Sequence, residues 1–254
     1  MALLVAGAAW AAGTLTAGGA AAAWLVGVLV LSATGWSGAL VLGAFFVPST
    51  LVGRLTRGRP SAGDAKGERR DPAQVLANGG AAALGALLEA TAPGLGLWIV
   101  TCSLAAAAAD TWATSIGTLS RSDPRLLGSG RAVPVGTSGA VSRLGTLGAV
   151  GGGLLVGVAG GLAGGGLPLL AVGTGIGFVG MLLDSLIGAV WQGRHLCPVC
   201  AVASERRIHR CGARTKWVGG LKWLDNDAVN ALTTGFAAIA GGLAWCWFSS
   251  TLIR

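Results

Sequence analysis

Three short polar windows interrupt a chain that is otherwise almost entirely apolar. The first 53 residues contain no Asp, Glu, Lys or Arg, and every basic residue except Arg254 falls within one of the windows. The windows cover residues 54–70, 121–143 and 194–222. Because the centre of a membrane helix excludes most charges, this pattern predicts loops at the windows and membrane-spanning helices between them.

The lengths of the apolar intervals set the number of helices. A helix needs about 20 residues to cross a hydrocarbon core of about 30 Å. Residues 71–120 and 144–193 therefore each fit two spans, the first 53 residues fit two, and residues 225–248 fit one. We predict an all-α, polytopic transmembrane helix bundle of about seven helices, within a range of about six to eight, as a single integral membrane domain over residues 1–254.

The beginning of the chain allows two interpretations. Residues 1–34 are apolar, but Gly13 and Thr14 interrupt them, so a short extra or re-entrant helix fits there. A cleaved signal peptide is the alternative, and the missing positively charged n-region counts against it.

The spacing of the windows also predicts the topology. Two crossings between successive windows return the chain to the same side, so all three basic windows are expected on one face of the membrane. The positive-inside rule makes that face cytoplasmic, with the N-terminus inside and the C-terminus outside. We expect an integral protein of the inner membrane of a prokaryote, surrounded by membrane lipids.

Composition supports the membrane assignment. Hydrophobic residues make up 53% of the chain, and only 11% of the residues are charged, against roughly 25% in globular proteins. This excludes a soluble enzyme, and the uncharged first 53 residues exclude a nucleic-acid-binding domain there despite the net charge of +8.

Glycines recur at four-residue spacing in the predicted fifth helix. The repeats are Gly148 and Gly152, followed by Gly153, Gly157, Gly161 and Gly165. Small residues at this spacing let membrane helices approach closely. Packing within one chain is the first interpretation, and a seam between two copies of a homo-oligomer is the second.

Two acids fall inside predicted spans. Asp110 follows a run of alanines, and Asp184 follows the apolar residues 181–183. Each has small residues or Thr four positions away, on the same helix face. Because an acid in hydrocarbon is costly, Asp110 and Asp184 are expected to face the bundle interior and to have a function.

Amide side chains extend this polar set. Asn78 and Asn230 lie at depths similar to those of the two acids, roughly 10 to 16 Å from the nearest window at 1.5 Å per residue. We therefore expect all four to line one cavity beneath the loops. Gln74 and Asn226 lie four residues before Asn78 and Asn230 and extend the same helix edges. An N-cap is the alternative role for the acids and amides at the start of the last helix.

Two windows contain candidate phosphate-binding groups. Thr137 and Ser138 lie in a glycine-bearing turn just before a predicted helix, where free N–H groups and the helix dipole favour an anion. This is no Walker A loop, because no lysine precedes Ser or Thr. In the first window, Lys66, Arg69 and Arg70 could bind phosphate or attract anionic lipid, and the sequence leaves both open.

The third window, residues 194–222, is a cytoplasmic loop containing cysteine and histidine. Cys197 and Cys200 form a CxxC motif, and His209 and Cys211 follow it. Such a set suits structural Zn²⁺, while free thiols and a disulfide are the alternatives that the sequence leaves open.

Several ordered motifs resemble one known family. The motifs are 66–71, 74–79, 109–113, 123–126, 133–139, 180–185 and 224–230. In this order they resemble the transmembrane protein 19 family, whose best-understood branch is the plant phytyl-phosphate kinase. The resemblance extends from about residue 17 to about residue 250 and is less specific for the substrate than for the family.

The resemblance implies a membrane-embedded, Mg²⁺-dependent kinase of isoprenoid lipid metabolism. It would transfer a phosphoryl group from a nucleoside triphosphate, CTP being the expected donor, to an isoprenyl monophosphate such as phytyl, geranylgeranyl or farnesyl phosphate. The expected partners are thus these two substrates, with no nucleic acid. An apolar groove between helices would hold the prenyl tail.

On this basis we assign roles to the polar residues. The catalytic residues are Asp110, Asp184, Lys66 and Arg70. The Mg²⁺ ligands are Asp110, Asp184, Asp225 and Asp227. The substrate-binding residues are Arg69, Gln74, Asn78, Thr111, Arg125, Thr137, Ser138, Asn226 and Asn230.

One position departs from the family pattern, and other functions remain as alternatives. Ser115 stands where the family usually has an acid, which puts a metal site that needs that acid in doubt.

A lipid-phosphate nucleotidyltransferase would use the same groups. A small-solute transporter would also contain buried acids and glycine-rich helices.

Overall fold

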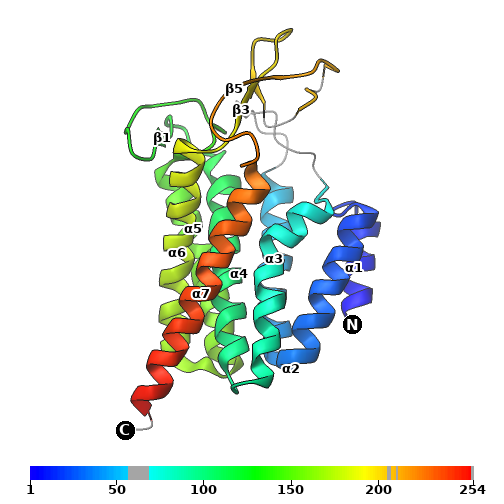
Figure 1. The fold of residues 1–254 in the computed structure, drawn as a ribbon, viewed down its shortest axis with the longest axis vertical. Coiled ribbons are helices and arrows are strands. Elements are labelled where there is room, and N and C mark those ends of the chain that lie inside the picture. Colours follow the sequence, from blue (N-terminus) through cyan, green and yellow to red (C-terminus); the bar gives the residue numbers. More distant parts are fainter. Residues whose placement is uncertain (57–68, 205–206, 210, 253–254) are drawn as a thin grey trace.

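The structure is a computed structural model that describes residues 1–56, 69–204, 207–209 and 211–252. These residues form a helical bundle with its long loops gathered at one end (Figure 1). The α-helices are α1 (Ala2–Ala11), α2 (Ala17–Leu55), α3 (Pro72–Ala86), α4 (Leu95–Gly117), α5 (Arg143–Gly160), α6 (Gly166–Val190) and α7 (Asn226–Leu252).

Short elements complete the fold. The 3-10 turn η1 (Leu87–Ala90) and the π-helical turn η2 (Gly161–Gly165) connect helices. The loops contain the strands β1 (Arg125–Leu126), β2 (Ala140–Val141), β3 (Arg194–Leu196), β4 (Ala203–Ser204) and β5 (Lys216–Gly219). β1 pairs antiparallel with β2, and β3 lies between β4 and β5, antiparallel to both.

Two glycine turns reverse the chain inside long helical segments. Gly35 interrupts α2 with φ 61° and ψ −148°, and the segment folds back so that Gly38 lies against Val30. Gly164, with φ 126°, does the same between α5 and α6. These positive φ values are the reason glycine stands at both turns. The first 55 residues thus supply two antiparallel spans, as predicted, preceded by α1 as the short extra helix.

The prediction of a mostly helical membrane bundle is confirmed. Four segments within the described residues are long and apolar enough to cross a membrane, namely Ala17–Leu55, Leu95–Gly117, Arg143–Val190 and Asn226–Thr251. The first and third of them contain the reversals. The interval from 71 to 120 forms the two helices α3 and α4.

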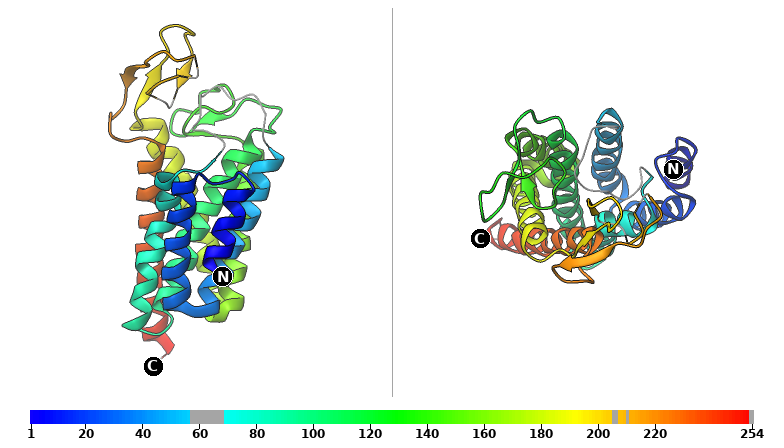
Figure 2. Two further views of the ribbon diagram at one scale, coloured as in Figure 1. Left: turned by 90° about the vertical axis from the view of Figure 1, so that its right-hand side faces the viewer. Right: turned by 90° about the horizontal axis from the view of Figure 1, so that it is seen from above.

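The two ends of the bundle differ. Tight turns lie at one end, where the Ser37 hydroxyl of the α2 reversal donates a 2.7 Å hydrogen bond to the carbonyl of Ala163 in η2. The second and third basic windows lie together at the opposite end (Figures 1 and 2). The flanks of the first window, Arg54 and Arg70, border one cavity at that same end. The cytoplasmic assignment of this end stays a prediction.

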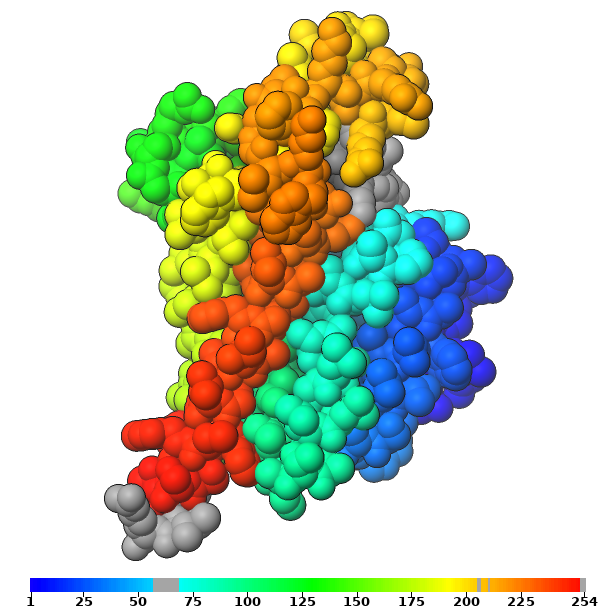
Figure 3. All heavy atoms as spheres, in the orientation of Figure 1, coloured from blue at the N-terminus to red at the C-terminus, as the bar shows by residue number. Residues whose placement is uncertain are grey.

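Helix α4 is the centre of the bundle. In its most apolar window 78% of the residues are buried, against 28% in each of the other spanning segments. The alanine run at 105–109 makes this possible, because small side chains let α5, α6 and α7 approach its backbone. α7 covers the face between α6 and α3 (Figure 3), and viewed from the loop end α1 and α2 lie at one edge of the bundle (Figure 2).

The glycine repeats of α5 pack within the chain. A methyl group at Gly152 would come within 2.7 Å of the Ala108 carbonyl oxygen of α4, and one at Gly148 within 2.8 Å of the Trp112 carbonyl oxygen. Gly153 and Gly157 instead face Thr174 of α6. The first interpretation of the repeats is therefore confirmed, since both faces of this helix are used in intramolecular contacts.

Candidate functional site

A polar cavity of about 250 Å³ lies beneath the second loop, beside the start of α7. Its wall combines α3, α4, α6, the start of α5 and the residues just before and at the start of α7. The sequence-predicted residues on this wall are Gln74, Asp110, Thr137, Ser138, Asp184, Asp225 and Asn226. Residues separated by more than 150 positions therefore meet at one site.

Asp110 and Asp184 reach the cavity from adjacent helices. One turn below them, Gly180 of α6 lies against Ala106 of α4 so closely that an added Cβ would be 2.7 Å from the alanine methyl group. Because residues four apart share a helix face, this contact brings both acids to the same seam. Each carboxylate is half-buried at the cavity wall.

A threonine of α7 supports Asp184. The Thr233 hydroxyl lies 3.3 Å from Asp184 Oδ2, to which it donates, and it also lies 3.2 Å from the Val229 carbonyl oxygen of its own helix. Thr233 is itself buried. The orientation of the Asp184 carboxylate is therefore coupled to the packing of α7 against α6.

The turn with Thr137 and Ser138 is fastened to the end of α6. Gly139 has a φ of 75°, and any Cβ there would collide with the backbone of Ala189. The Ser138 hydroxyl donates a 2.7 Å hydrogen bond to Oε1 of Gln192, a buried residue just past α6. These contacts hold the turn over the cavity rather than leaving it free in solvent.

The N-terminus of α5 also borders this cavity. Ser142 caps the helix, since its Oγ accepts a 3.0 Å hydrogen bond from the Gly145 amide. Ser142 and Gly145 both belong to the cavity wall. The predicted combination of a glycine-bearing turn and a helix N-terminus is thus present, and its dipole favours an anion at the cavity.

Residues at the start of α7 both cap the helix and line the polar cavity. Asp225 Oδ1 accepts a 3.0 Å hydrogen bond from the Ala228 amide, so the capping interpretation is correct for this acid. Asp225 and Asn226 nevertheless also border the cavity. Asp227 and Asn230 are buried, 7% and 8% exposed, and do not belong to the cavity wall.

The expectation that two acids and two amides share one cavity is therefore correct only for the acids. Asn78 borders a different cavity, and its Nδ2 donates a 2.8 Å hydrogen bond to the Gln74 carbonyl oxygen. Asn230 lies one turn before Thr234, whose hydroxyl donates to the Ala77 carbonyl oxygen of α3. Equal depth along separate helices does not fix the direction in which each helix faces, so depth alone could not separate these residues.

The second cavity is apolar and measures about 190 Å³. α1, α2 and α3 line it with side chains such as Val26, Phe45 and Phe46, and its polar residues are Arg70, Gln74 and Asn78. Gln74 borders both cavities. The groove expected from the family resemblance has a counterpart here, directly beside the polar cavity.

Gln74 is held in place by the start of α3. Its Oε1 accepts a 3.0 Å hydrogen bond from the Asp71 amide, and its own amide donates a 2.9 Å bond to Asp71 Oδ1. This reciprocal capping box leaves the NH₂ group as the donating part of the side chain. Gln74 is therefore positioned by local helix chemistry at the junction of the two cavities.

The cationic residues separate into different environments. Arg70 pairs through its backbone with the turn between α1 and α2, and its side chain borders the apolar cavity. Burial lowers the pKa of the Arg70 guanidinium, which stays cationic because arginine starts from so high a value. Arg69 is exposed beside Gly13, and Lys66 lies outside the described residues.

Two more assigned residues lie away from the polar cavity. The Arg125 guanidinium is exposed, and its Nη1 donates a 2.8 Å hydrogen bond to the Gly130 carbonyl oxygen. Thr111 is next to Asp110 in sequence but does not belong to the cavity wall. Ser115 is also off the wall, although its neighbour Thr114 belongs to it.

Sequence reasoning missed six polar residues of the site, among them Thr118 and the capping residue Ser142 on the cavity wall. Thr114 and Ser185 line the cavity, while Gln192 and Thr233 hold groups that do. Thr114 could have been found, since it lies one turn after Asp110 on the same face. Gln192 and Thr233 act through partners 54 and 49 residues away, and no local pattern reveals such contacts.

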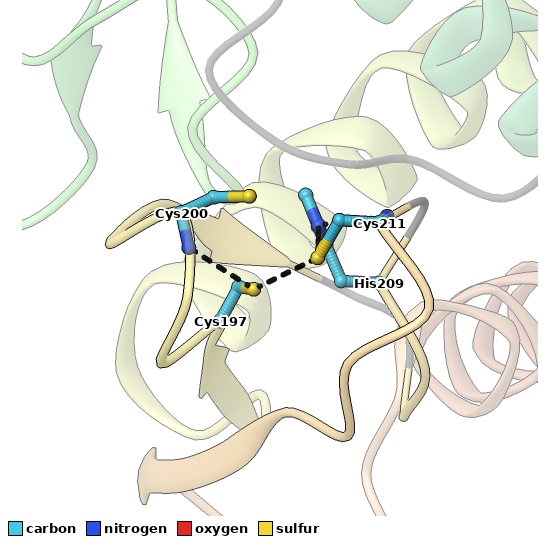
Figure 4. A group of neighbouring side chains, drawn as sticks. All are labelled: Cys197, Cys200, His209 and Cys211. Atoms are coloured by element: carbon cyan, nitrogen blue, oxygen red, sulfur yellow. Dashed lines mark hydrogen bonds between the residues drawn. The ribbon is translucent and has the colours of Figure 1, made fainter.

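The cysteine and histidine residues of the third loop form a separate cluster. Ligand atoms of Cys197, Cys200, His209 and Cys211 all lie within 4.8 Å of one another (Figure 4). None of these residues belongs to the walls of the two cavities described above.

Comparison with known proteins gives relatives in three groups of organisms. An uncharacterized membrane protein of the archaeon Methanocaldococcus jannaschii is 30% identical over 222 residues, which cover 87% of this chain and 82% of the relative. An uncharacterized membrane protein of the cyanobacterium Synechocystis is 32% identical over 242 residues, covering 90% and 82%. The protein PGR of Arabidopsis thaliana is 29% identical over 249 residues, covering 85% and 84%.

No solved structure matches the chain significantly. The sequence model of one family, described as integral membrane protein DUF92, matches residues 1–238. Since this match covers nearly the whole chain, the protein belongs to the DUF92 family of integral membrane proteins.

Proposed function

We propose that this integral membrane protein is a prenyl-phosphate kinase of the transmembrane protein 19 type. It transfers the γ-phosphoryl group of a nucleoside triphosphate, with CTP as the expected donor, to an isoprenyl monophosphate and forms the diphosphate. The proposal rests on the motif resemblance together with the arrangement of the two cavities.

The observation that carries the proposal is the sharing of Gln74 by a polar and an apolar cavity. An isoprenyl monophosphate has a long apolar tail and one dianionic head. The apolar cavity between α1, α2 and α3 suits the tail. Arg70 is one of its three polar lining residues and supplies a positive charge for the phosphate. The head then reaches the polar cavity past Gln74, where Asp110 and Asp184 stand.

The acids of the polar cavity suit a magnesium nucleotide. Mg²⁺ in such enzymes takes one or two carboxylates together with phosphate oxygens, and Asp110, Asp184 and Asp225 border the same cavity. When bound, the ion would neutralise charge on the transferring phosphates. Asp227 is buried off the cavity wall, so we no longer count it among the ligands.

The chemistry requires positioning more than acid–base catalysis. An oxygen of the prenyl phosphate attacks the γ-phosphorus, the bond from that phosphorus to the β–γ bridging oxygen breaks, and the nucleoside diphosphate leaves. The attacking phosphate monoester is already largely dianionic at neutral pH, so no general base is needed. The α5 N-terminus and the turn at Thr137 would bind phosphate oxygens of the donor.

Labelled nucleotides test this proposal. Purified protein in lipid nanodiscs is incubated with Mg²⁺, with farnesyl, geranylgeranyl or phytyl phosphate, and with CTP or ATP labelled at either the α- or the γ-phosphate. We expect the γ label in a lipid diphosphate. The α label in lipid would instead identify a nucleotidyltransferase, and the absence of label from lipid across the whole panel would reject the kinase.

A further inference from the structure

The third loop has almost no hydrophobic core of its own. Within the described residues from 194 to 222, only Cys197 and Ser204 are buried. Val199, Ile208 and Val218 are between 57% and 72% exposed. Segments of fewer than about 40 residues usually need a metal or a disulfide to hold a fixed fold. The ordered three-stranded sheet β4-β3-β5 therefore needs another source of stability.

We propose that Cys197, Cys200, His209 and Cys211 bind a structural zinc ion that folds this loop at the loop end of the bundle. The proposal is independent of the kinase activity, because these residues touch neither cavity. The ligand atoms come from two segments of the loop, one with Cys197 and Cys200 and one with His209 and Cys211, whose side chains point toward one another (Figure 4).

The distances match a tetrahedral zinc site. With Zn–S bonds of about 2.3 Å, tetrahedral geometry places two sulfur ligands about 3.8 Å apart. The Sγ atoms of Cys197 and Cys211 are 3.6 Å apart, and Nδ1 of His209 lies 3.1 Å from Cys211 Sγ. A disulfide would require about 2.05 Å between sulfurs. The separation of Cys197 and Cys211 is thus closer to that of two ligands of one ion than to that of a disulfide.

The backbone around the CxxC motif is shaped for sulfur ligands. The Cys200 amide donates a 3.4 Å hydrogen bond to Cys197 Sγ, and the Ala201 amide donates a 2.9 Å bond to the Cys197 carbonyl oxygen. Ala201 has a φ of 55°, and no other non-glycine residue of the described chain has a positive φ. Alanine rarely adopts this left-handed conformation, which persists only where the surrounding structure imposes it.

The crowding of the three sulfurs suits a divalent cation. The ligand atoms of all four residues lie within 4.8 Å of one another. Zinc binds cysteine as the thiolate, and its charge offsets the repulsion between thiolates held this close together.

Zinc would affect the polar cavity only through the two ends of the third loop, at residues 191–193 and 221–224. There, the Gly193 amide donates a 2.8 Å hydrogen bond to the Leu224 carbonyl oxygen, and the Leu221 amide donates one of 2.8 Å to Trp191. Gln192, between these contacts, accepts the Ser138 hydroxyl. The loop therefore begins and ends where α6 meets α7. Its fold affects the polar cavity through the contact between Gln192 and Ser138 and leaves the helices unchanged.

Metal analysis of the full chain in detergent tests the proposal. Protein purified without chelator should contain about one zinc per chain. Cys197→Ser and Cys211→Ser should each lose it, whereas Cys246→Ser should retain it, because Cys246 is an exposed cysteine of α7 outside the cluster. Less than about a tenth of an equivalent in the wild type, even after addition of ZnCl₂, would overturn the proposal, as would zinc retained by Cys211→Ser.

Thiol counting keeps the test decisive if the variants fail to fold. In the wild type, a zinc chelator should expose three further thiols to a thiol reagent, and the helix content should not change. An equal thiol count before and after chelation would show free thiols and refute the site. Thiols that appear only after a reductant would show a disulfide and refute it as well.

Discussion

Gly180 of α6 and Ala106 of α4 are in direct contact, and a Cβ added to the glycine would come within 2.7 Å of the alanine methyl group. One helical turn towards the loops, the same two faces carry Asp184 and Asp110 at the polar cavity. The close approach of α4 and α6 is thus the structural reason why two acids 74 positions apart border one site.

Gly180→Ala should weaken the bundle. The added methyl group must push α6 from α4, which costs about 1–3 kcal/mol in a well-packed interior. We expect a lower unfolding temperature in detergent. Gly175→Ala on the same helix is the control, since a Cβ there meets nothing within 4 Å, and it should be neutral or slightly stabilising. Equal unfolding temperatures for the two variants would contradict the contact.

Asp110→Asn and Asp184→Asn should each reduce the proposed kinase activity by about 100-fold or more, because the amide keeps the shape but loses the charge that binds the metal nucleotide. Turnover of γ-labelled donor is the measurement, with unfolding temperature as the check on folding. Asp123→Asn is the matched control, an exposed loop acid off the cavity wall. Wild-type rates in both cavity variants would exclude these acids from the site.

Thr233→Val should change the magnesium dependence more than the maximal rate. The variant removes the donor that lies 3.3 Å from Asp184 Oδ2, so the carboxylate loses its fixed orientation. Loss of such a supporting hydrogen bond typically weakens metal binding by about tenfold. A Mg²⁺ titration of activity measures this. Thr233→Ser should restore the wild-type curve, and a curve unchanged in the valine variant would show that the contact has no role.

Gly43→Leu should impair the use of long prenyl phosphates. Gly43 borders the apolar cavity, and a Cβ there meets nothing within 4 Å, so a larger side chain is accommodated and reduces the space for a tail. We expect a higher KM for phytyl phosphate than in the wild type and a smaller change for a short-chain prenyl phosphate. Gly80→Leu, another open glycine not on that wall, should leave both values unchanged. The same rise in KM from both variants would argue against a tail site.

Some features of the site were predictable because they depend on local chemistry. The cost of an acid in hydrocarbon singled out Asp110 and Asp184, and the small residues one turn away indicated that each faces another helix. The spacing of the cysteines likewise identified the third loop as a candidate zinc site. Gln192 and Thr233 were not predictable, because their roles depend on hydrogen bonds to partners on distant segments.

The sequence by itself determined the class and the order of the fold. The exclusion of charge from hydrocarbon divides the chain into spans and loops, and glycine at four-residue spacing specifies close helix packing. Only the tertiary structure decided which polar residues share a cavity. In the packed bundle Asn78 borders the apolar cavity, Asn230 is buried off both cavity walls, and Gln74 lies at the junction of the two cavities. Those positions arise from side-chain packing between helices, which periodicity along one helix does not contain.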